Sequence, residues 1–276
     1  MEPSDLKKSI EKLRKAFLDL SDEDQFDARD IKLVKSSDIP CISFLETNSS
    51  LSKALETLVK HCQWRKKEHI NDLKATDFPA EVFRLGWLYH QGSDLDGHPL
   101  MWMRLKVPLG PRSLLLKYFT YSLEVVRNRT LADEIKPAVI YDCRNPSIDI
   151  NALKELVHIG LNQYPPWIEY IVFLEMSSTF AFFCRAARYF FPKHLRDHVK
   201  FMSASQLESL ISLDNFPDYM GGKITTIDTP TLQQCPSFSS FAETQKLDKS
   251  EIESIQRYFD ENIGLKENLN NPECAN

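Results

Sequence analysis

The chain has 276 residues, of which 42% are hydrophobic and 26% charged, with 34 basic and 39 acidic side chains. This composition is typical of a globular protein with its own hydrophobic core and excludes a largely disordered chain. The formal net charge of −5 argues against a nucleic-acid-binding protein, because such a protein needs a basic face.

The sequence contains only eight glycines, and the glycine-rich motifs that bind phosphates or hold a nucleophile are absent. The six cysteines are scattered, without the spacing of a zinc site. We therefore expect no enzyme, no cofactor and no metal site. The first residues lack the features of a secretory signal, and no run of 18 apolar residues could span a bilayer. These features predict a soluble cytoplasmic protein with reduced thiols.

Residues 1–75 are expected to form a helical N-terminal lobe. Apolar residues recur at helical spacing from Leu6 to Leu20. A second helix is expected over residues 28–34 and should end before Pro40, because the residue that precedes a proline is disfavoured in a helix. A third helix is expected to begin after Ser50, whose hydroxyl can cap it.

Residues 76–226 are expected to form an α/β domain. Two strands, over residues 82–89 and 100–107, should flank a turn that contains Asp96-Gly97, a strong hairpin signal. Short apolar strands and helices then alternate, which predicts a mainly parallel sheet covered by helices. The expected strands are 137–141, 168–174 and 199–202, and the expected helices are 112–131, 149–162, 179–191 and 205–211.

Residues 227–276 carry few apolar side chains. We expect this stretch to wrap around the preceding domain, with one helix over residues 249–259. The last residues, 268–276, should form a mobile end, because chain ends with few apolar residues are poorly held.

The segment 179–191 is the most informative stretch of the sequence. Wound as a helix, it places Phe180, Phe183 and Ala187 on one face. The other faces are apolar as well, interrupted only by two arginines. A helix that is hydrophobic nearly all round is either buried in a core or faces apolar material on both sides. The residues alone leave both alternatives open.

Four short motifs, in this order, resemble the CRAL-TRIO family, which includes phosphatidylinositol-transfer, tocopherol-transfer and retinaldehyde-binding proteins. The motifs are Trp64-Arg65-Lys66, Asp96-Gly97-His98-Pro99, Tyr164-Pro165-Pro166 and Phe216-Pro217 with Gly221-Gly222. The resemblance implies a helical lobe and a mainly parallel sheet around an apolar lipid pocket. It also implies non-catalytic lipid binding and transfer, or lipid sensing. The ligand would be a lipid or an isoprenoid-like molecule.

In the family resembled, the helix at residues 179–191 is the gate of the lipid pocket and engages membranes. The resemblance therefore implies two groups of residues. The pocket would be lined by Tyr141, Val172, Leu174, Phe180, Phe183 and Ala187. The outer side of the gate would present Phe182, Phe190 and Phe191.

Basic residues around the gate would face anionic lipid, where each contributes ~1 kcal/mol; the alternative is an ordinary solvated helix end. Glu155 falls where the family has a headgroup-binding glutamate. However, no basic pair follows Phe44-Leu45, so half of an inositol-phosphate site is missing. The expected headgroup and membrane residues are Glu155, Arg185, Arg188, Lys193 and Arg196.

A further set of residues, Phe26-Asp27-Ala28-Arg29-Asp30 and Asn71-Asp72-Leu73, is similar to one family member whose chain continues into a major-sperm-protein domain and a membrane anchor. The resemblance also leaves a second function open. The chain could be a membrane or protein adaptor that has kept the fold and lost lipid exchange, in which case a protein partner is expected beside peripheral membrane contact.

Overall fold

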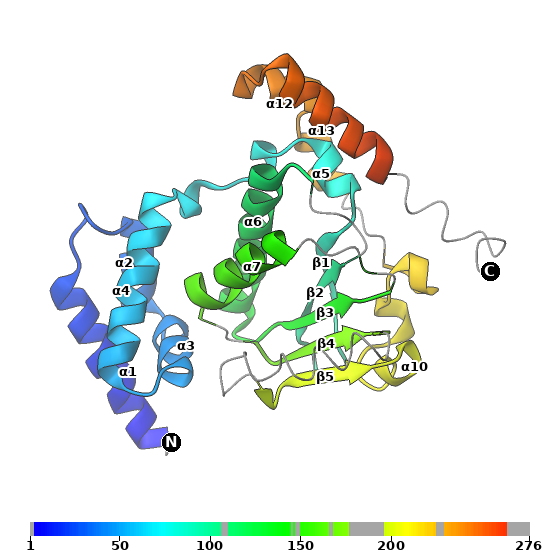
Figure 1. Cartoon of the computed structure of the whole chain (residues 1–276). Helices are drawn as coiled ribbons and strands as arrows, with labels where there is room; N and C mark the ends of the chain where they lie inside the picture. The colour runs from blue at the N-terminus through cyan, green and yellow to red at the C-terminus, as the bar shows by residue number, and fades with distance from the viewer. Residues whose placement is uncertain are drawn as a thin grey trace. The chain divides into compact units, whose positions relative to one another are not determined.

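The computed structural model describes residues 3–105, 110–144, 146, 150–165, 168–176, 196–224 and 229–263 (Figure 1). The chain divides into two units. The first consists of Met1–Leu73 with Val157–Trp167, and the second of Lys74–Leu156 with Ile168–Asn276. In its described residues the first unit is helical, and the second contains the sheet.

The first unit is built on the helices α1 (Pro3–Leu20), α2 (Ala28–Ser36), α3 (Ile39–Thr47) and α4 (Leu51–Lys67). The expected helices at α1, α2 and α4 are confirmed, and the Ser50 hydroxyl accepts a hydrogen bond from the Lys53 amide at 3.2 Å. The expected end of the second helix before Pro40 is confirmed, since α2 ends at Ser36, whereas α3 was not predicted. Pro40 lies in the first turn of α3, where its missing N–H is not needed.

A buried ion pair connects α2 with α4. The Nε atom of Arg65 donates to Asp30 Oδ1 at 2.9 Å, and both side chains are almost completely buried. The Asn71 amide of η1 (Ile70–Asp72) donates to the second carboxylate oxygen at 2.8 Å. Removing either charge would leave the other one buried without compensation, which is strongly destabilising.

The second segment of the first unit contains a π-helical turn, η3 (Ile159–Gln163). The carbonyl oxygen of Gln163 lies 2.5 Å from Nδ1 of His61. The ring of Tyr164 packs edge-on against His61 and Trp64, with centroid distances of 5.7 and 5.6 Å. Residues separated by about a hundred positions therefore share one aromatic cluster within this unit.

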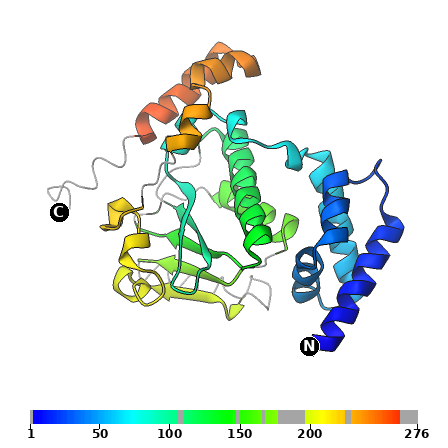
Figure 2. The same cartoon turned by 180° about the vertical axis from the view of Figure 1, so that it is seen from behind.

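The sheet of the second unit has the strand order β1-β2-β3-β4-β5 (Figures 1 and 2). β1 runs antiparallel to β2, and the remaining neighbours are parallel. The predicted mainly parallel sheet is thereby confirmed. The strands are β1 (Leu88–Ser93), β2 (Pro99–Arg104), β3 (Ala138–Asp142), β4 (Tyr170–Leu174) and β5 (Val199–Met202).

The hairpin turn between β1 and β2 depends on Asp94. One of its carboxylate oxygens accepts hydrogen bonds from the amides of Asp96 and His98, at 3.0 and 2.8 Å. The other accepts the hydroxyl of Tyr170 at 2.8 Å. Gly97 has φ = +91°, which other residues rarely adopt. The predicted turn at Asp96-Gly97 is confirmed, and the side chain of Asp94 holds it in place.

The helices of the second unit differ from expectation at two places. A helix, α5 (Ala80–Arg84), occupies the first part of the strand expected over residues 82–89. The helix expected over residues 205–211 is only one turn long, as α10 (Ala204–Leu207). The expected helices at α6 (Arg112–Asp133) and α7 (Ile150–His158) are confirmed, α7 continuing into η3.

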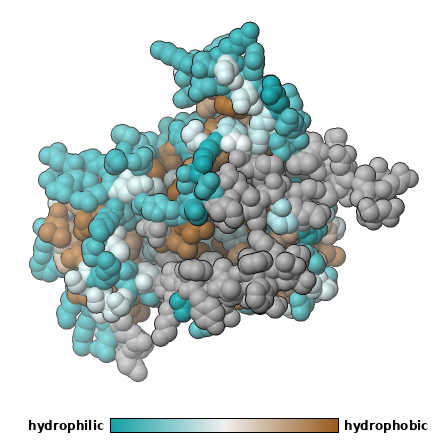
Figure 3. Space-filling model, viewed as in Figure 1, coloured by the Kyte–Doolittle hydropathy of each residue, from teal (hydrophilic) through white to brown (hydrophobic). Residues whose placement is uncertain are grey.

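The C-terminal segment forms α11 (Thr229–Gln234), α12 (Phe238–Gln245) and α13 (Lys249–Asn262). The last of these confirms the helix expected over residues 249–259, whereas the first two were not predicted. In Figure 3 the surface of this region, at the top, is mostly hydrophilic. α13 packs closely at Gly110, where an added Cβ would lie 2.2 Å from the ring of Tyr258, so only glycine allows this contact.

Candidate functional site

The two faces of the sheet are built from different side chains. Successive residues of a strand point to opposite faces, and the register fixes which residues share a face. Tyr141 of β3 pairs with Met103 of β2 and with Phe173 of β4. Phe173 pairs in turn with Phe201 of β5. These four side chains therefore form one row across the sheet.

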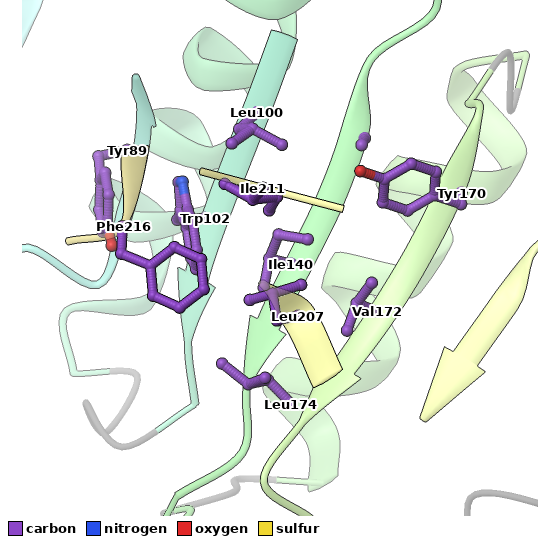
Figure 4. Packing of buried hydrophobic residues seen from close by; sticks show 11 residues of the cluster. Tyr89, Leu100, Trp102, Ile140, Tyr170, Val172, Leu174, Leu207, Ile211 and Phe216 are labelled. Atoms are coloured by element: carbon purple, nitrogen blue, oxygen red, sulfur yellow. The ribbon is translucent and has the colours of Figure 1, made fainter. Parts of the chain in front are cut away.

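The opposite face is a filled core, shown in Figure 4. There Trp102, Ile140, Val172 and Leu174 are completely buried. They pack with buried residues that follow β5 and end at Phe216, whose ring meets Trp102 edge-on at 6.4 Å. Side chains packed this closely form a core, and these residues therefore do not line a lipid pocket.

The row on the other face contains three stacked rings, which we call the aromatic row: Tyr141, Phe173 and Phe201. The centroids of Tyr141 and Phe173 are 5.1 Å apart with 14° between the ring planes. Those of Phe173 and Phe201 are 5.6 Å apart with 18° between the planes. Offset stacking at these distances stabilises each pair beyond the area that it buries.

The aromatic row combines a desolvated environment with accessible surface. Burial raises the pKa of Tyr141 to about 12, because its ionised form is poorly hydrated there. Nevertheless, Tyr141, Phe173 and Phe201 are only partly buried, in contrast to the core residues on the other face. Rings that are remote from bulk water but still accessible are typical of the lining of an apolar ligand site.

α6 covers the β1–β2 end of this face. It packs against both strands, and the Tyr118 hydroxyl of α6 donates to the carbonyl oxygen of Leu88 at 3.0 Å. Leu88 is the register partner of Met103 and therefore lies on the same face as the aromatic row. The buried side of this helix thus closes one end of the face that carries the three rings.

The predicted pocket residues do not come together as expected. Tyr141 lies in the aromatic row, whereas Val172 and Leu174 point to the opposite face and are part of the filled core. The three cannot line one pocket, because residues in register across two strands share a face and their chain neighbours do not. The other pocket residues, Phe180, Phe183 and Ala187, lie outside the described residues.

Sequence reasoning missed Phe173 and Phe201. The signal was present in the sequence, because each of β3, β4 and β5 carries an aromatic residue one position before its last residue. In parallel strands of matched register, aromatic residues at the same distance from the strand ends fall on one face.

The predicted gate and headgroup residues are only partly described. Phe182, Phe190, Phe191, Arg185, Arg188 and Lys193 lie outside the described residues. Arg196 is partly buried. Glu155 of α7 is bound to Arg112 at the start of α6 through two contacts of 2.8 Å. The carboxylate of Glu155 thus already has a cation, and a headgroup bound there would compete with Arg112.

Two features are absent from the described residues, a membrane-spanning helix and a group of metal ligands. None of the helices in that part of the chain is long and apolar enough to cross a membrane. In the same part of the chain, no three His, Cys, Asp or Glu side chains are grouped as metal ligands would be.

Comparisons with known proteins agree with this architecture. The crystal structure of Sfh5 is similar, with a TM-score of 0.59 over 89% of this chain and 98% of that chain. At 14% sequence identity, this likeness shows the fold. The family model for the CRAL/TRIO domain matches residues 83–222, half of the chain. The chain therefore belongs to the CRAL/TRIO family of lipid-binding and lipid-transfer proteins.

Proposed function

We propose that this protein carries a lipid, or an isoprenoid-like hydrophobic molecule, against the aromatic row and does no covalent chemistry on it. The observation that carries the proposal is the partly accessible stack of Tyr141, Phe173 and Phe201 opposite a filled core. Apolar surface covered by such a ligand contributes ~25 cal/mol per Å². An elongated hydrophobic ligand would be held by burial alone.

Release of the ligand requires a part of the protein that opens, and for this we propose the segment 179–191. Its sequence is apolar nearly all round, which suits a helix between a bound lipid and a bilayer. Phe182, Phe190 and Phe191 would enter the membrane interface. Arg185, Arg188, Lys193 and Arg196 would contact anionic headgroups. The protein would act in the cytoplasm, peripherally attached to intracellular membranes.

Lipid extraction followed by mass spectrometry tests the carrier function. Protein purified without detergent should contain a stoichiometric hydrophobic ligand. Phe173→Asp places a charge in the middle of the aromatic row and should abolish ligand recovery, because an unpaired charge is costly to bury under a lipid. Leu213→Asp is the matched control, since Leu213 is 50% exposed. Equal recovery from both variants, or no ligand in the unchanged protein and no transfer between vesicles, would refute the carrier function.

Vesicle sedimentation tests the gate. The triple variant Arg185→Glu, Arg188→Glu, Lys193→Glu should lose binding to phosphatidylserine vesicles while its ligand content is retained. Arg129→Glu on α6, which reverses one charge elsewhere, is the control. Sedimentation of the triple variant that matches that of the unchanged protein would contradict the proposed membrane contact.

The adaptor function is the second candidate, and the Glu155–Arg112 pair together with the missing basic pair after Phe44-Leu45 supports it. It predicts an empty aromatic row and a protein partner in pull-downs. We also propose that the chain is related to the N-terminal half of motile sperm domain-containing protein 2, on the motifs at residues 26–30 and 71–73. Phosphatidylinositol is not favoured as a specific ligand, because the cations for its phosphate are incomplete.

A further inference from the structure

A group of polar side chains lies on the core face of the sheet, where β2 and β3 end. Arg104 is the last residue of β2, and its register partner Asp142 is the last residue of β3. Both share the face of Trp102 and Ile140, opposite to the aromatic row. Ligands of α/β folds commonly bind beyond the carboxyl ends of parallel strands.

Arg104 is a buried cation whose charge is poorly compensated. It is only 3% exposed, whereas buried arginines are normally paired. Within the described part of the chain, its Nε atom has no hydrogen-bond partner. Its guanidinium lies over the ring of Tyr219, 4.2 Å from the centroid. The ring attracts the cation through its π electrons. It does not, however, accept the N–H hydrogen bonds that the guanidinium directs within its own plane.

The neighbouring carboxylate is already engaged. Arg144 binds Asp142 through both oxygens, at 2.9 Å from Nε and 2.7 Å from Nη2. The Arg144 guanidinium also lies 5.4 Å from the centroid of Tyr219. Tyr219 is thus flanked by two guanidinium groups, and its hydroxyl is 3.0 Å from that of Tyr89.

The group is open to solvent on one side. The side chain of Arg144 is 38% exposed, and Tyr219 is only partly buried. A second carboxylate, Glu175, lies close enough to Arg144 to stabilise its positive charge. However, one of its oxygens accepts the amide of Ala204 at 2.6 Å. Arg104, in contrast, has no salt bridge to a carboxylate among the residues that the structure describes.

We propose that this arginine–tyrosine cluster, formed by Arg104, Arg144, Tyr219, Tyr89 and Asp142, binds an oxyanion of the phosphate type. The anion would supply the in-plane acceptor that Arg104 lacks and would take over Arg144 from Asp142, since guanidinium groups bind phosphate through paired hydrogen bonds. The tyrosine hydroxyls can donate to its remaining oxygens. Because the cluster lies on the face opposite to the aromatic row, this site is separate from the proposed lipid site.

Titrations of the full chain with two probes test the site. Inorganic phosphate presents the oxyanion alone, and dihexanoyl phosphatidic acid presents it as a lipid headgroup below its micelle concentration. Arg144→Gln should weaken binding by about tenfold, because a charge-assisted pair is lost. Asp142→Asn should strengthen binding severalfold, because it removes the competing carboxylate. A purely structural role of the cluster would not give these opposite signs.

Arg129→Gln is the matched control, since Arg129 is 43% exposed and also pairs with an aspartate, at 3.4 Å. It should leave binding unchanged, and thermal unfolding of each variant shows that the fold is kept. Similar behaviour of both probes would identify free phosphate as sufficient, whereas binding of the lipid alone would assign the site to a headgroup. Absence of binding at millimolar concentrations, or binding that Arg144→Gln does not weaken, would overturn the proposal.

Discussion

The two faces of the sheet differ in how completely their side chains are enclosed. On one face, Trp102, Ile140 and Leu174 have no accessible surface and pack with the segment that ends at Phe216. On the other, Tyr141 and Phe173 stack on each other and remain partly accessible. The same strands supply both faces, so the difference comes from what covers each face. The filled face supports the fold, whereas the other face leaves its aromatic row only partly covered.

The largest expected contrast is in stability. Trp102→Ala on the filled face should lower the free energy of unfolding by ~3–5 kcal/mol, the usual effect of removing a large buried aromatic side chain. Phe173→Ala on the other face should have a much smaller effect, because its ring is only partly buried. Denaturant unfolding of both variants measures the difference. Equal losses would show that the aromatic row is part of the core.

A smaller contrast concerns two tyrosine hydroxyls. Tyr170→Phe removes the hydrogen bond to Asp94 and should cost ~1.5–3 kcal/mol, as for bonds to charged groups. Tyr141→Phe removes a hydroxyl from the accessible face and should change stability by no more than ~0.5 kcal/mol. Thermal unfolding of the two variants makes the comparison, and the reverse order would contradict the assignment of the faces.

The smallest expected effect is on the dependence of stability on pH. Burial raises the pKa of Tyr141 to about 12, above the value of ~10 in an unfolded chain. Between these values the unfolded state loses the tyrosine proton first. The contribution of Tyr141 is therefore fully present below pH ~10 and is lost as the pH rises through the folded pKa. Tyr141→Phe should flatten the decline in this window, as urea unfolding at several alkaline pH values would show.

Local sequence signals predicted much of the fold, and their failures have local causes. Asp96-Gly97 identified the hairpin, and the hydroxyl of Ser50 identified the start of α4. α3 was missed because Pro40 was taken only as the end of the preceding helix, although a proline is tolerated in the first turn of a helix. Residues 82–85 misled because a short apolar run is compatible with either a strand or a buried helix.

The site was harder to predict because it depends on register. Tyr141, Val172 and Leu174 all lie on central strands, which made them equal candidates. Only the pairing of Tyr141 with Phe173 shows that Val172 and Leu174 point away. The arginine–tyrosine cluster shows the same limit, since Arg104 and Tyr219 are distant in sequence and no local pattern connects them.

The π-helical segment has a consequence for biosynthesis. The helical unit contains residues 157–167 as well as its N-terminal stretch, and Tyr164 packs on His61 and Trp64. Domains usually fold in the order in which they leave the ribosome. Here the helices α1 to α4 are synthesised before residues 157–167, which complete their unit. That unit can be completed only after β1, β2 and β3 have been translated. During that interval the aromatic cluster of His61 and Trp64 lacks the ring of Tyr164, and the apolar side of Trp64 is less covered than in the finished unit.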